Sequence, residues 1–137
     1  MRSILNILIL TASIIYFSCR EEIISPSNIA GNINEPVKLN SNTSYSFSIN
    51  ADKISSNVVD SSPFYSLRSS CYVTILDHSS GSVQIIIAGL SNHIMFNQTF
   101  TADISSFPAV FEGTSPQYIQ LKFINFTGKF RFELNKL

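Results

Sequence analysis

Hydrophobic and polar residues alternate with a period of two through most of the chain after residue 36. Tyr45, Phe47 and Ile49, for example, are separated by serines. Successive side chains of a β-strand point to opposite faces, so this alternation predicts strands with one face in a core and the other in water. No window longer than a turn has the 3.6-residue period of a helix, and no internal repeat is present. The predicted strands are 37–39, 45–49, 71–76, 83–88, 94–104, 110–111, 119–123 and 130–134, with 58–59 as a candidate edge strand.

Two pairs of these strands are separated by short runs of turn-forming residues. Asp77 to Gly81 follows the first member of one pair, and Asn125 to Gly128 follows the first member of the other. Strands that flank such turns commonly form β-hairpins, so two hairpins are predicted. The arms of the first carry apolar residues on both sides, which indicates a central position in a sheet covered on two faces.

Other segments interrupt the alternation. Asn50 to Ser62 is mostly polar and is predicted to be a connector. The long strand after residue 93 places Gln98 on its apolar side, where we expect a bulge. Phe107-Pro108 is expected to end that strand, since proline cannot donate a hydrogen bond within a sheet.

Seven to nine short strands with turns between them are typical of an all-β sandwich or a small barrel. Pro63, Pro108 and Pro116 indicate strand edges, which a closed barrel lacks. We therefore predict a single antiparallel β-sandwich of Greek-key or jelly-roll type, with a small β-barrel as the alternative. The predicted core consists of Tyr45, Phe47, Ile49, Val73, Ile75, Val83, Ile85, Ile87, Phe96, Phe100, Leu121, Phe123, Phe130 and Phe132.

The first nineteen residues have a different pattern. Arg2 supplies a positive charge, Ile4 to Phe17 is an apolar run, and the small residue Ser18 precedes Cys19. This is the three-part layout of an export signal. A helix formed by this apolar run would be about 21 Å long. A membrane-spanning helix usually needs ~20 apolar residues, or about 30 Å.

Tyr16-Phe17-Ser18-Cys19 resembles the lipobox of bacterial lipoprotein precursors. That resemblance implies cleavage before Cys19 and attachment of lipid to this cysteine, which would anchor the chain to a membrane of the bacterial cell envelope, with the outer membrane favoured. The acidic pair Glu21-Glu22 resembles a tag for transfer to the outer face of that membrane. An ordinary secretory signal and an uncleaved apolar anchor are the alternatives. Cleavage before Cys19 would make residues 1–18 a signal peptide. Residues up to Glu35 include Pro26 and Gly31 and have no sustained period, which predicts a lipidated flexible tether (19–35) ahead of the β-sandwich domain (36–137).

Charged residues are sparse and balanced. They make up 13% of the chain, with nine basic and nine acidic residues, against roughly 25% in an average soluble protein. A nucleic-acid partner is not expected, because it would require a clustered basic excess. The three N-x-S/T triplets, at Asn42, Asn97 and Asn125, are about what chance gives in a chain so rich in asparagine, serine and threonine.

Residues suited to catalysis or metal binding are few. His78 and His93 are the only histidines, and the sequence neighbours of His78 in a turn cannot converge on it as a catalytic relay requires. No cysteine pair or histidine pair has the spacing of a metal site. We therefore expect no catalytic residue, no metal and no cofactor. Cys71 is expected to be a buried, inert thiol if Cys19 carries lipid, with a Cys19–Cys71 disulfide as the alternative.

Aromatic and basic residues supply two weak candidates for binding. An aromatic patch at the rim of the domain would comprise Phe64, Tyr65, Tyr72 and Tyr118. A basic surface for an anionic partner would comprise Lys122, Lys129, Arg131 and Lys136. Alternatively, the aromatic rings cap the ends of the core, and the basic residues serve only to keep the domain soluble.

These observations favour a lipid-anchored envelope protein with a binding or structural role and no catalysis. Its expected partners are the membrane, through lipid on Cys19, and an envelope protein or glycan. A carrier with a cavity of about 300 Å³ or more for a lipid or sugar is the second hypothesis. An accessory domain of an envelope enzyme system is the third.

Overall fold

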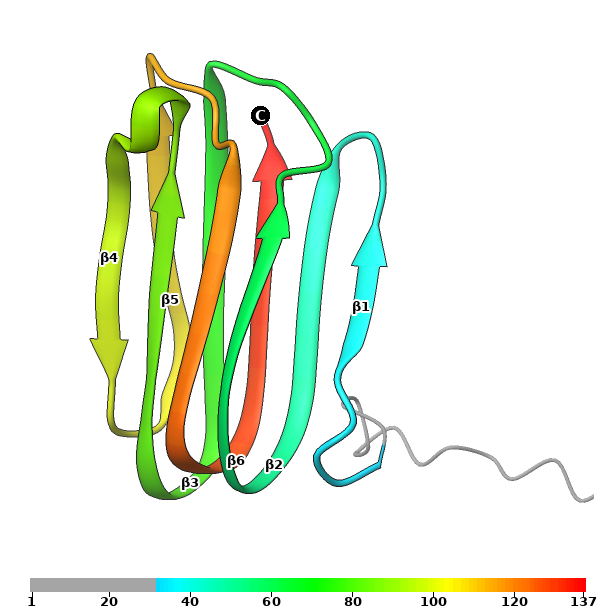
Figure 1. Ribbon diagram of the computed structural model, residues 1–137, viewed down its shortest axis with the longest axis vertical. Helices are drawn as coiled ribbons and strands as arrows, with labels where there is room; N and C mark the ends of the chain where they lie inside the picture. Colours follow the sequence, from blue (N-terminus) through cyan, green and yellow to red (C-terminus); the bar gives the residue numbers. More distant parts are fainter. Residues whose placement is uncertain (1–31) are drawn as a thin grey trace, which may run out of the picture.

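Six antiparallel strands and one short 3₁₀ helix make up residues 32–137, the part of the chain that the computed structural model describes (Figure 1). The sheet order is β1-β2-β6-β3-β4, and β5 pairs with the half of β3 that β4 leaves free. This part contains no helix with the length and hydrophobicity needed to cross a membrane. The elements are β1 (Val37–Asn40), β2 (Ser44–Ser61), β3 (Arg68–Ala88), η1 (Leu90–Asn92), β4 (Ile94–Phe100), β5 (Ile104–Glu112) and β6 (Tyr118–Lys136).

Each of the long strands β2, β3 and β6 bends back over itself at the same end of the molecule (Figure 1). The register of their pairing shifts at the bends, near residues 51–56 of β2, 76–82 of β3 and 124–127 of β6. The link from β4 to β5, residues 101–103, lies at the same end. The two halves of each strand therefore face each other instead of pairing side by side.

Folding the sheet in this way produces two layers. The β5 layer contains β1, the first half of β2, the second half of β6, the first half of β3, and β5. The β4 layer contains the other halves of β2, β6 and β3, and β4. We call the end with the bends the bend end. The opposite end, with connections 62–67, 89–93 and 113–117, is the loop end. The predicted all-β sandwich is confirmed, and the barrel alternative is wrong because the outer strands of residues 32–137 do not pair to close the sheet. The predicted seven to nine short strands are replaced by six, because β2, β3 and β6 each continue through a bend from one layer to the other.

Turn-forming residues at the bends allow the backbone to change direction. Lys53, Asp77, Gly81 and Asn125 all have positive φ there. Gly81 lies so close to β6 that a Cβ would overlap the backbone carbonyl oxygens of Ile124 and Asn125. The Ser80 hydroxyl donates to the Asn125 carbonyl at 3.1 Å, which joins two bends.

The core lies between the layers. The rings of Phe123 and Phe130, from opposite halves of β6, meet edge to face with centroids 5.2 Å apart, a favoured aromatic geometry. Phe47 stacks on Phe123 at 6.0 Å. The predicted core residues are buried except Phe96, which is half-buried because β4 is an edge strand. Further buried residues are Ala51, Phe64, Cys71, Ala88, Phe111, Ile119, Phe126 and Leu134.

The two predicted hairpins are wrong. Residues 71–88 belong to the single strand β3, and residues 119–134 belong to β6. The arms of each supposed hairpin pair with other strands, so that Ile75 lies opposite Phe130 and Ile85 lies opposite Leu121. The predicted central position of β3 is confirmed, since β6 flanks it on one side and β4 and β5 flank it on the other. The predicted cover on both faces is wrong, because Tyr72 and Leu76 are exposed on the outer face of β3.

Three local predictions also need correction. The connector predicted for residues 50–62 is the bend and second half of β2, which does form an edge at Val58 and Val59. The strand predicted for 94–104 is interrupted at residues 101–103 instead of bulging at Gln98. Pro108 lies inside β5, where it is tolerated because β5 is an edge strand that pairs only with β3.

Candidate functional site

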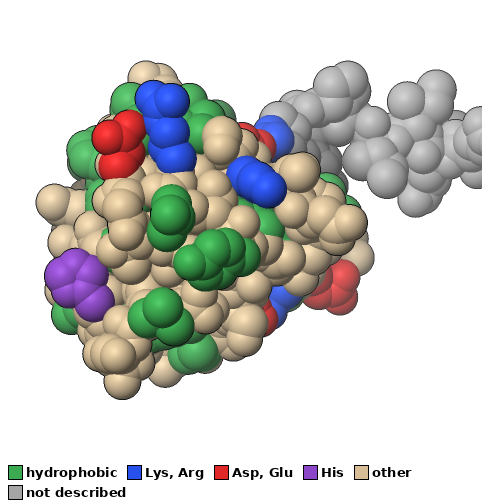
Figure 2. Space-filling view, turned by 90° about the horizontal axis from the view of Figure 1, so that it is seen from above, with side chains coloured by type: hydrophobic (Ala, Val, Ile, Leu, Met, Phe, Trp, Pro, Cys, Tyr) green, Lys and Arg blue, Asp and Glu red, His purple; other side chains and the backbone are tan. Residues whose placement is uncertain are grey.

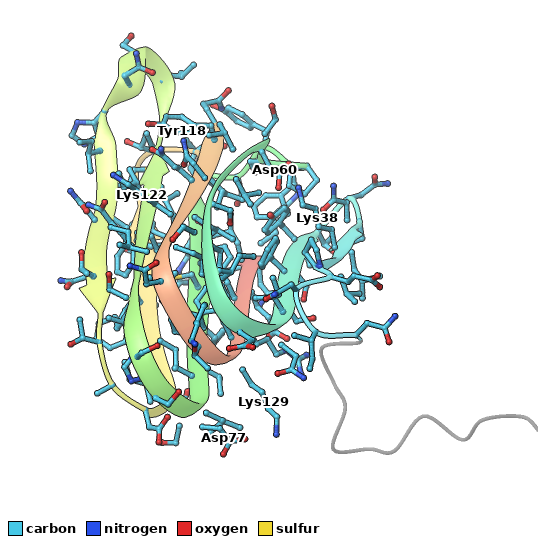
Figure 3. All side chains as sticks on the ribbon, turned by 60° about the horizontal axis from the view of Figure 1, so that its bottom comes forward. Lys38, Asp60, Asp77, Tyr118, Lys122 and Lys129 are labelled. Carbon is cyan, nitrogen blue, oxygen red and sulfur yellow. The ribbon has the colours of Figure 1, made fainter. Side chains whose placement is uncertain are left out.

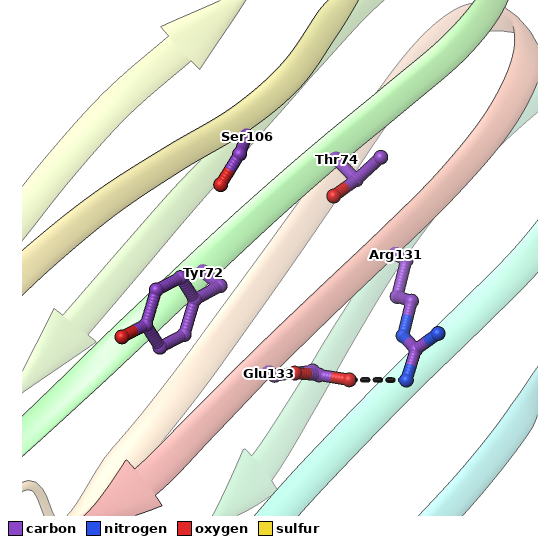
Figure 4. A pocket seen from close by; sticks show the side chains of 5 residues that line it. All are labelled: Tyr72, Thr74, Ser106, Arg131 and Glu133. Carbon is purple, nitrogen blue, oxygen red and sulfur yellow. Dashed lines mark ion pairs between the residues drawn. The ribbon is translucent and has the colours of Figure 1, made fainter.

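A shallow pocket opens on the outer face of the β5 layer (Figure 4). Its volume is about 310 Å³, and its lining comes from three adjacent strands. β3 contributes Tyr72 and Thr74, β5 contributes Ser106, and β6 contributes Arg131 and Glu133. Each side chain points outward because its neighbours in the strand, such as Val73 and Phe132, fill the core.

An ion pair between Arg131 and Glu133 forms one wall of the pocket (Figure 4). The two residues are two apart in β6 and so share a face. Thr74 lies opposite Arg131 in the register, and Tyr72 lies opposite Glu133. The Arg131 side chain is 48% exposed and the Glu133 side chain 30%, so both remain accessible from solvent.

The aromatic wall is Tyr72, a residue that is 41% exposed. Tyr72 lies on a central strand, with Glu133 opposite on one side and Pro108 opposite on the other. The Thr74 hydroxyl donates to the Ser105 carbonyl at 3.4 Å and so links β3 to β5 beside the pocket. The pocket thus combines an aromatic ring, two hydroxyl groups and a mutually neutralised charge pair on a rigid sheet.

The four aromatic residues predicted as a ligand patch are dispersed in the structure. Phe64 is buried beneath the loop end at 8% exposure, and Tyr65 beside it is 64% exposed. Tyr118 lies on the outer face of the β4 layer, opposite to the face that carries Tyr72 (Figure 3). Of the four, Tyr72 alone lines the pocket.

Thr74, Ser106 and Glu133 were not predicted as site residues. Their outward orientation follows from the alternation, but their proximity depends on the register between β3, β5 and β6. The predicted hairpins paired each arm with the wrong strand, so no sequence signal placed Tyr72 opposite Glu133.

The predicted basic surface is divided between the two layers. Lys122 lies on the β4 layer and Lys129 on the β5 layer (Figure 3). Arg131 lies on the outer face of the β5 layer. Lys129 pairs with Asp77 at 2.7 Å, and Arg131 pairs with Glu133. Lys136 is the last residue of β6. This division and pairing leave no strong local excess of positive charge at the pocket.

The histidines occupy opposite ends of the molecule. The backbone N–H of His78, at the bend end, donates to Asp103 at 2.7 Å, and its Nε2 lies 3.1 Å from the Gly81 carbonyl oxygen. Asp77 is engaged by Lys129. His93 adjoins η1 at the loop end. Among residues 32–137 no three His, Cys, Asp or Glu side chains converge as a metal site would require.

Two groups with strongly shifted pKa values lie away from the pocket. Burial raises the pKa of the Cys71 thiol to about 12, despite a hydrogen bond with the Ala109 backbone. Burial, with the hydrogen bond to Asp60 and its charge, also raises the pKa of the Tyr45 hydroxyl far above its usual range. Both groups therefore stay protonated at neutral pH, which disfavours nucleophilic chemistry at either.

Exposed hydrophobic side chains also occur at the loop end. Tyr65, Leu67 and Leu90 are each more than half exposed in this region. Viewed from this end, hydrophobic side chains form separate groups divided by polar and backbone atoms (Figure 2). Separate groups of this kind are ordinary on soluble proteins, whereas a binding patch is usually continuous.

Comparison with protein-family models and with curated proteins finds no match for this chain. The signal peptide, Cys19 and most of the predicted tether lie outside the described residues 32–137.

Proposed function

We propose that this chain is a lipid-anchored protein of the bacterial cell envelope that binds a partner, without catalysis, through the outer face of the β5 layer. The observation that carries the binding role is the pocket formed by Tyr72, Thr74, Ser106, Arg131 and Glu133. It presents groups that donate and accept hydrogen bonds beside an aromatic ring. Binding sites commonly combine a shaped surface with a few polar groups of this kind.

The proposed anchoring rests on the export signal and on Cys19. The start of the described chain lies at the bend end, where Asn34 donates its backbone N–H to the Asn50 carbonyl at 2.7 Å. The Asn34 side chain accepts from the Asp52 N–H at 2.8 Å and donates to the Asp52 carbonyl at 3.1 Å. A membrane anchor ahead of this point would attach the domain through its bend end and leave the outer face of the β5 layer uncovered.

The packed core favours surface binding over the carrier alternative. Aromatic rings from both layers lie in contact between them, as Phe47, Phe123 and Phe130 do. The 310 Å³ pocket lies outside this core, on the sheet surface. An accessory role in an envelope enzyme system would use the same outer face.

Mass spectrometry of the mature N-terminus tests the proposed anchoring. The protein isolated from membranes is expected to begin at Cys19 with lipid attached, and Cys19→Ala is expected to remain unprocessed and to lack lipid. A wild-type chain that begins at another residue would refute the lipoprotein assignment.

Site-specific photocrosslinking in cells tests the binding face. A photoreactive amino acid at Ser106, beside the pocket, is expected to give a discrete crosslinked product that Tyr72→Ala suppresses. The matched control is Asn97, which is exposed on the outer face of the β4 layer and should give no such product. Equal crosslinking from both positions, or none from Ser106, would argue against the β5 layer as the binding face.

A further inference from the structure

We infer that the pocket on the β5 layer binds a neutral saccharide, with one sugar ring stacked on Tyr72. This inference rests on the proposed binding function and names the class of ligand. It follows from three properties of the pocket: an exposed aromatic ring on a rigid strand, a mixed set of hydrogen-bonding groups, and a balanced charge.

The aromatic ring provides a stacking surface. One face of a pyranose ring presents C–H bonds with slight positive charge, which are attracted to the negative face of an aromatic ring. Tyr72 is 41% exposed, and its strand is held by β6 on one side and β5 on the other. Little backbone freedom therefore remains to be lost on binding, which reduces the entropic cost of ordering the site.

The polar groups match the needs of sugar hydroxyls. Each sugar hydroxyl both donates and accepts hydrogen bonds, so it is best satisfied by a site that offers both. Arg131 can only donate, Glu133 can only accept, and the hydroxyls of Thr74 and Ser106 can do either. All four line the same pocket as Tyr72.

The charges of the pocket favour a neutral ligand. Arg131 and Glu133 neutralise each other, and Lys129, the next outward residue along β6, is neutralised by Asp77 at 2.7 Å. A phosphate or uronate would have to compete with Glu133 for Arg131 and would remain close to a carboxylate. An uncharged polyol adds hydrogen bonds to both members of the pair without separating them.

The size and shape of the pocket limit the ligand. A volume of about 310 Å³ lies at the lower end of the range for small-molecule sites, which leaves room for roughly one or two sugar rings. Because the pocket is shallow and open, a longer chain could extend across the sheet in both directions. Affinity for a single site is expected to be modest, with Kd of about 0.1–1 mM.

Calorimetric titration of the purified full chain tests this inference. The neutral probes are maltohexaose, cellohexaose, N-acetylchitohexaose and mannohexaose, and the anionic comparison is a galacturonate hexamer. We expect at least one neutral probe to bind and the galacturonate hexamer to bind more weakly or not at all. Tyr72→Ala is expected to weaken binding about tenfold or more, whereas Tyr72→Phe, which keeps the stacking face, should change it by less than about threefold.

The matched control is Tyr118→Ala. It removes a partly exposed tyrosine from the opposite outer face and should leave saccharide binding unchanged. Replacing the ion pair by Arg131→Gln together with Glu133→Gln keeps the pocket neutral and should weaken binding about threefold to tenfold through the loss of charge-assisted hydrogen bonds. Thermal unfolding of each variant reports whether the domain remains folded.

Three results would overturn the inference: no binding of any neutral probe at about 10 mM, preferential binding of galacturonate, or equal losses from Tyr72→Ala and Tyr118→Ala. The proposed binding function is tested separately, by crosslinking from Ser106. A crosslink from Ser106 without saccharide binding would retain the β5 layer as a binding face for a protein partner. Loss of both signals would remove the binding function as well.

Discussion

The position of Gly81 in the structure can be occupied without strain only by glycine. It lies at the bend of β3 with φ of +75°, where side chains with a Cβ are rarely found. The same position packs against the carbonyl oxygens of Ile124 and Asn125 in β6. Gly113, in the link between β5 and β6, has a similar φ of +84° but has open space around the position of a Cβ. Substitution of Gly113 therefore measures the energetic cost of a positive φ alone, whereas substitution of Gly81 adds the cost of steric overlap.

We predict that Gly81→Ala lowers the free energy of unfolding by about 2–4 kcal/mol, since the added methyl group must displace the backbone of β6 as well as adopt a strained φ. Gly113→Ala should cost about 1 kcal/mol, because only the conformational penalty applies. Urea unfolding of both variants provides the comparison. Equal losses at the two sites would contradict the close approach of β3 and β6 at the bend.

At the scale of the strands, the sequence predicted which residues face the core but not which strands pair. Alternation is a local property, so Tyr45, Phe47 and Val73 were assigned to the core correctly. Turn-forming residues such as Asp77 to Gly81 are compatible both with a hairpin and with a bend that places two strand halves face to face. The choice depends on distant strands, here β6 beside β3, which no local pattern encodes.

Prediction of the candidate site failed for the same reason, because the sequence pattern does not show which strands pair. Tyr72 was among the predicted aromatic ligand residues, and Arg131 was among the predicted basic ones. Their association depends on the pairing of β3 with β6, in which Tyr72 lies opposite Glu133 and Thr74 lies opposite Arg131. Long-range register was therefore the missing information, not the orientation of single side chains.

Engineered disulfides distinguish a bend from a hairpin in β6. In a hairpin closed by residues 125–128, Lys122 and Arg131 would be direct neighbours, whereas the structure places them on opposite outer faces. We predict that Lys122→Cys with Arg131→Cys forms no disulfide under mild oxidation. Its positive controls are Lys122→Cys with Gln84→Cys or with Asn57→Cys, which are pairs in register.

At least one of those two control pairs should crosslink. The N–H and C=O of a strand residue point to the same neighbour, so one of its two partners is a non-hydrogen-bonded pair with Cα atoms about 4.5 Å apart. That separation lies within the range of natural disulfides. Free-thiol titration and mass spectrometry measure the outcome. Efficient crosslinking between positions 122 and 131 would mean that β6 is a hairpin after all.

At the scale of the whole molecule, a polar cluster joins the two layers along one open side. Lys38 of β1 pairs with Asp60 of β2 at 2.8 Å, and the hydroxyl of Tyr45 donates to the same carboxylate at 2.7 Å (Figure 3). Lys38 and Tyr45 belong to the β5 layer, whereas Asp60 belongs to the β4 layer. Burial acts to raise the pKa of Asp60, but the hydrogen bonds from Lys38 and Tyr45 and the charge of Lys38 outweigh it and hold the pKa below 3.8.

Stability is therefore predicted to depend on the ionisation of Asp60. Because its pKa is lower in the folded state, the contribution is complete above the ordinary value of 3.8 and is lost as the pH falls through the folded-state value. Asp60→Asn should lower the unfolding free energy by about 0.5–1 kcal/mol at pH 6 and make little difference at pH 2. Denaturant unfolding from pH 6 to pH 2 measures both curves.

Glu112→Gln is the control for this titration. Glu112 pairs with Arg68 at 3.0 Å, but both side chains are about two-thirds exposed, so the loss of its charge should change stability by less than about 0.5 kcal/mol. The prediction would be contradicted if the unfolding free energies of the wild type and of Asp60→Asn differed by the same amount at every pH. Ionisation of Asp60 would then make no contribution to the stability of the domain.

The course of β1 has a mechanical consequence. This strand runs toward the loop end (Figure 1), held to β2 by a register of four residue pairs. Under the proposed anchoring, tension between the membrane and a ligand on the β5 layer would pull β1 along its own axis. The hydrogen bonds to β2 and the Lys38–Asp60 pair would then share the load in shear instead of breaking one after another. A domain attached in this way should withstand more force along the axis of β1 than across it, because a pull across the strand would break its hydrogen bonds one after another.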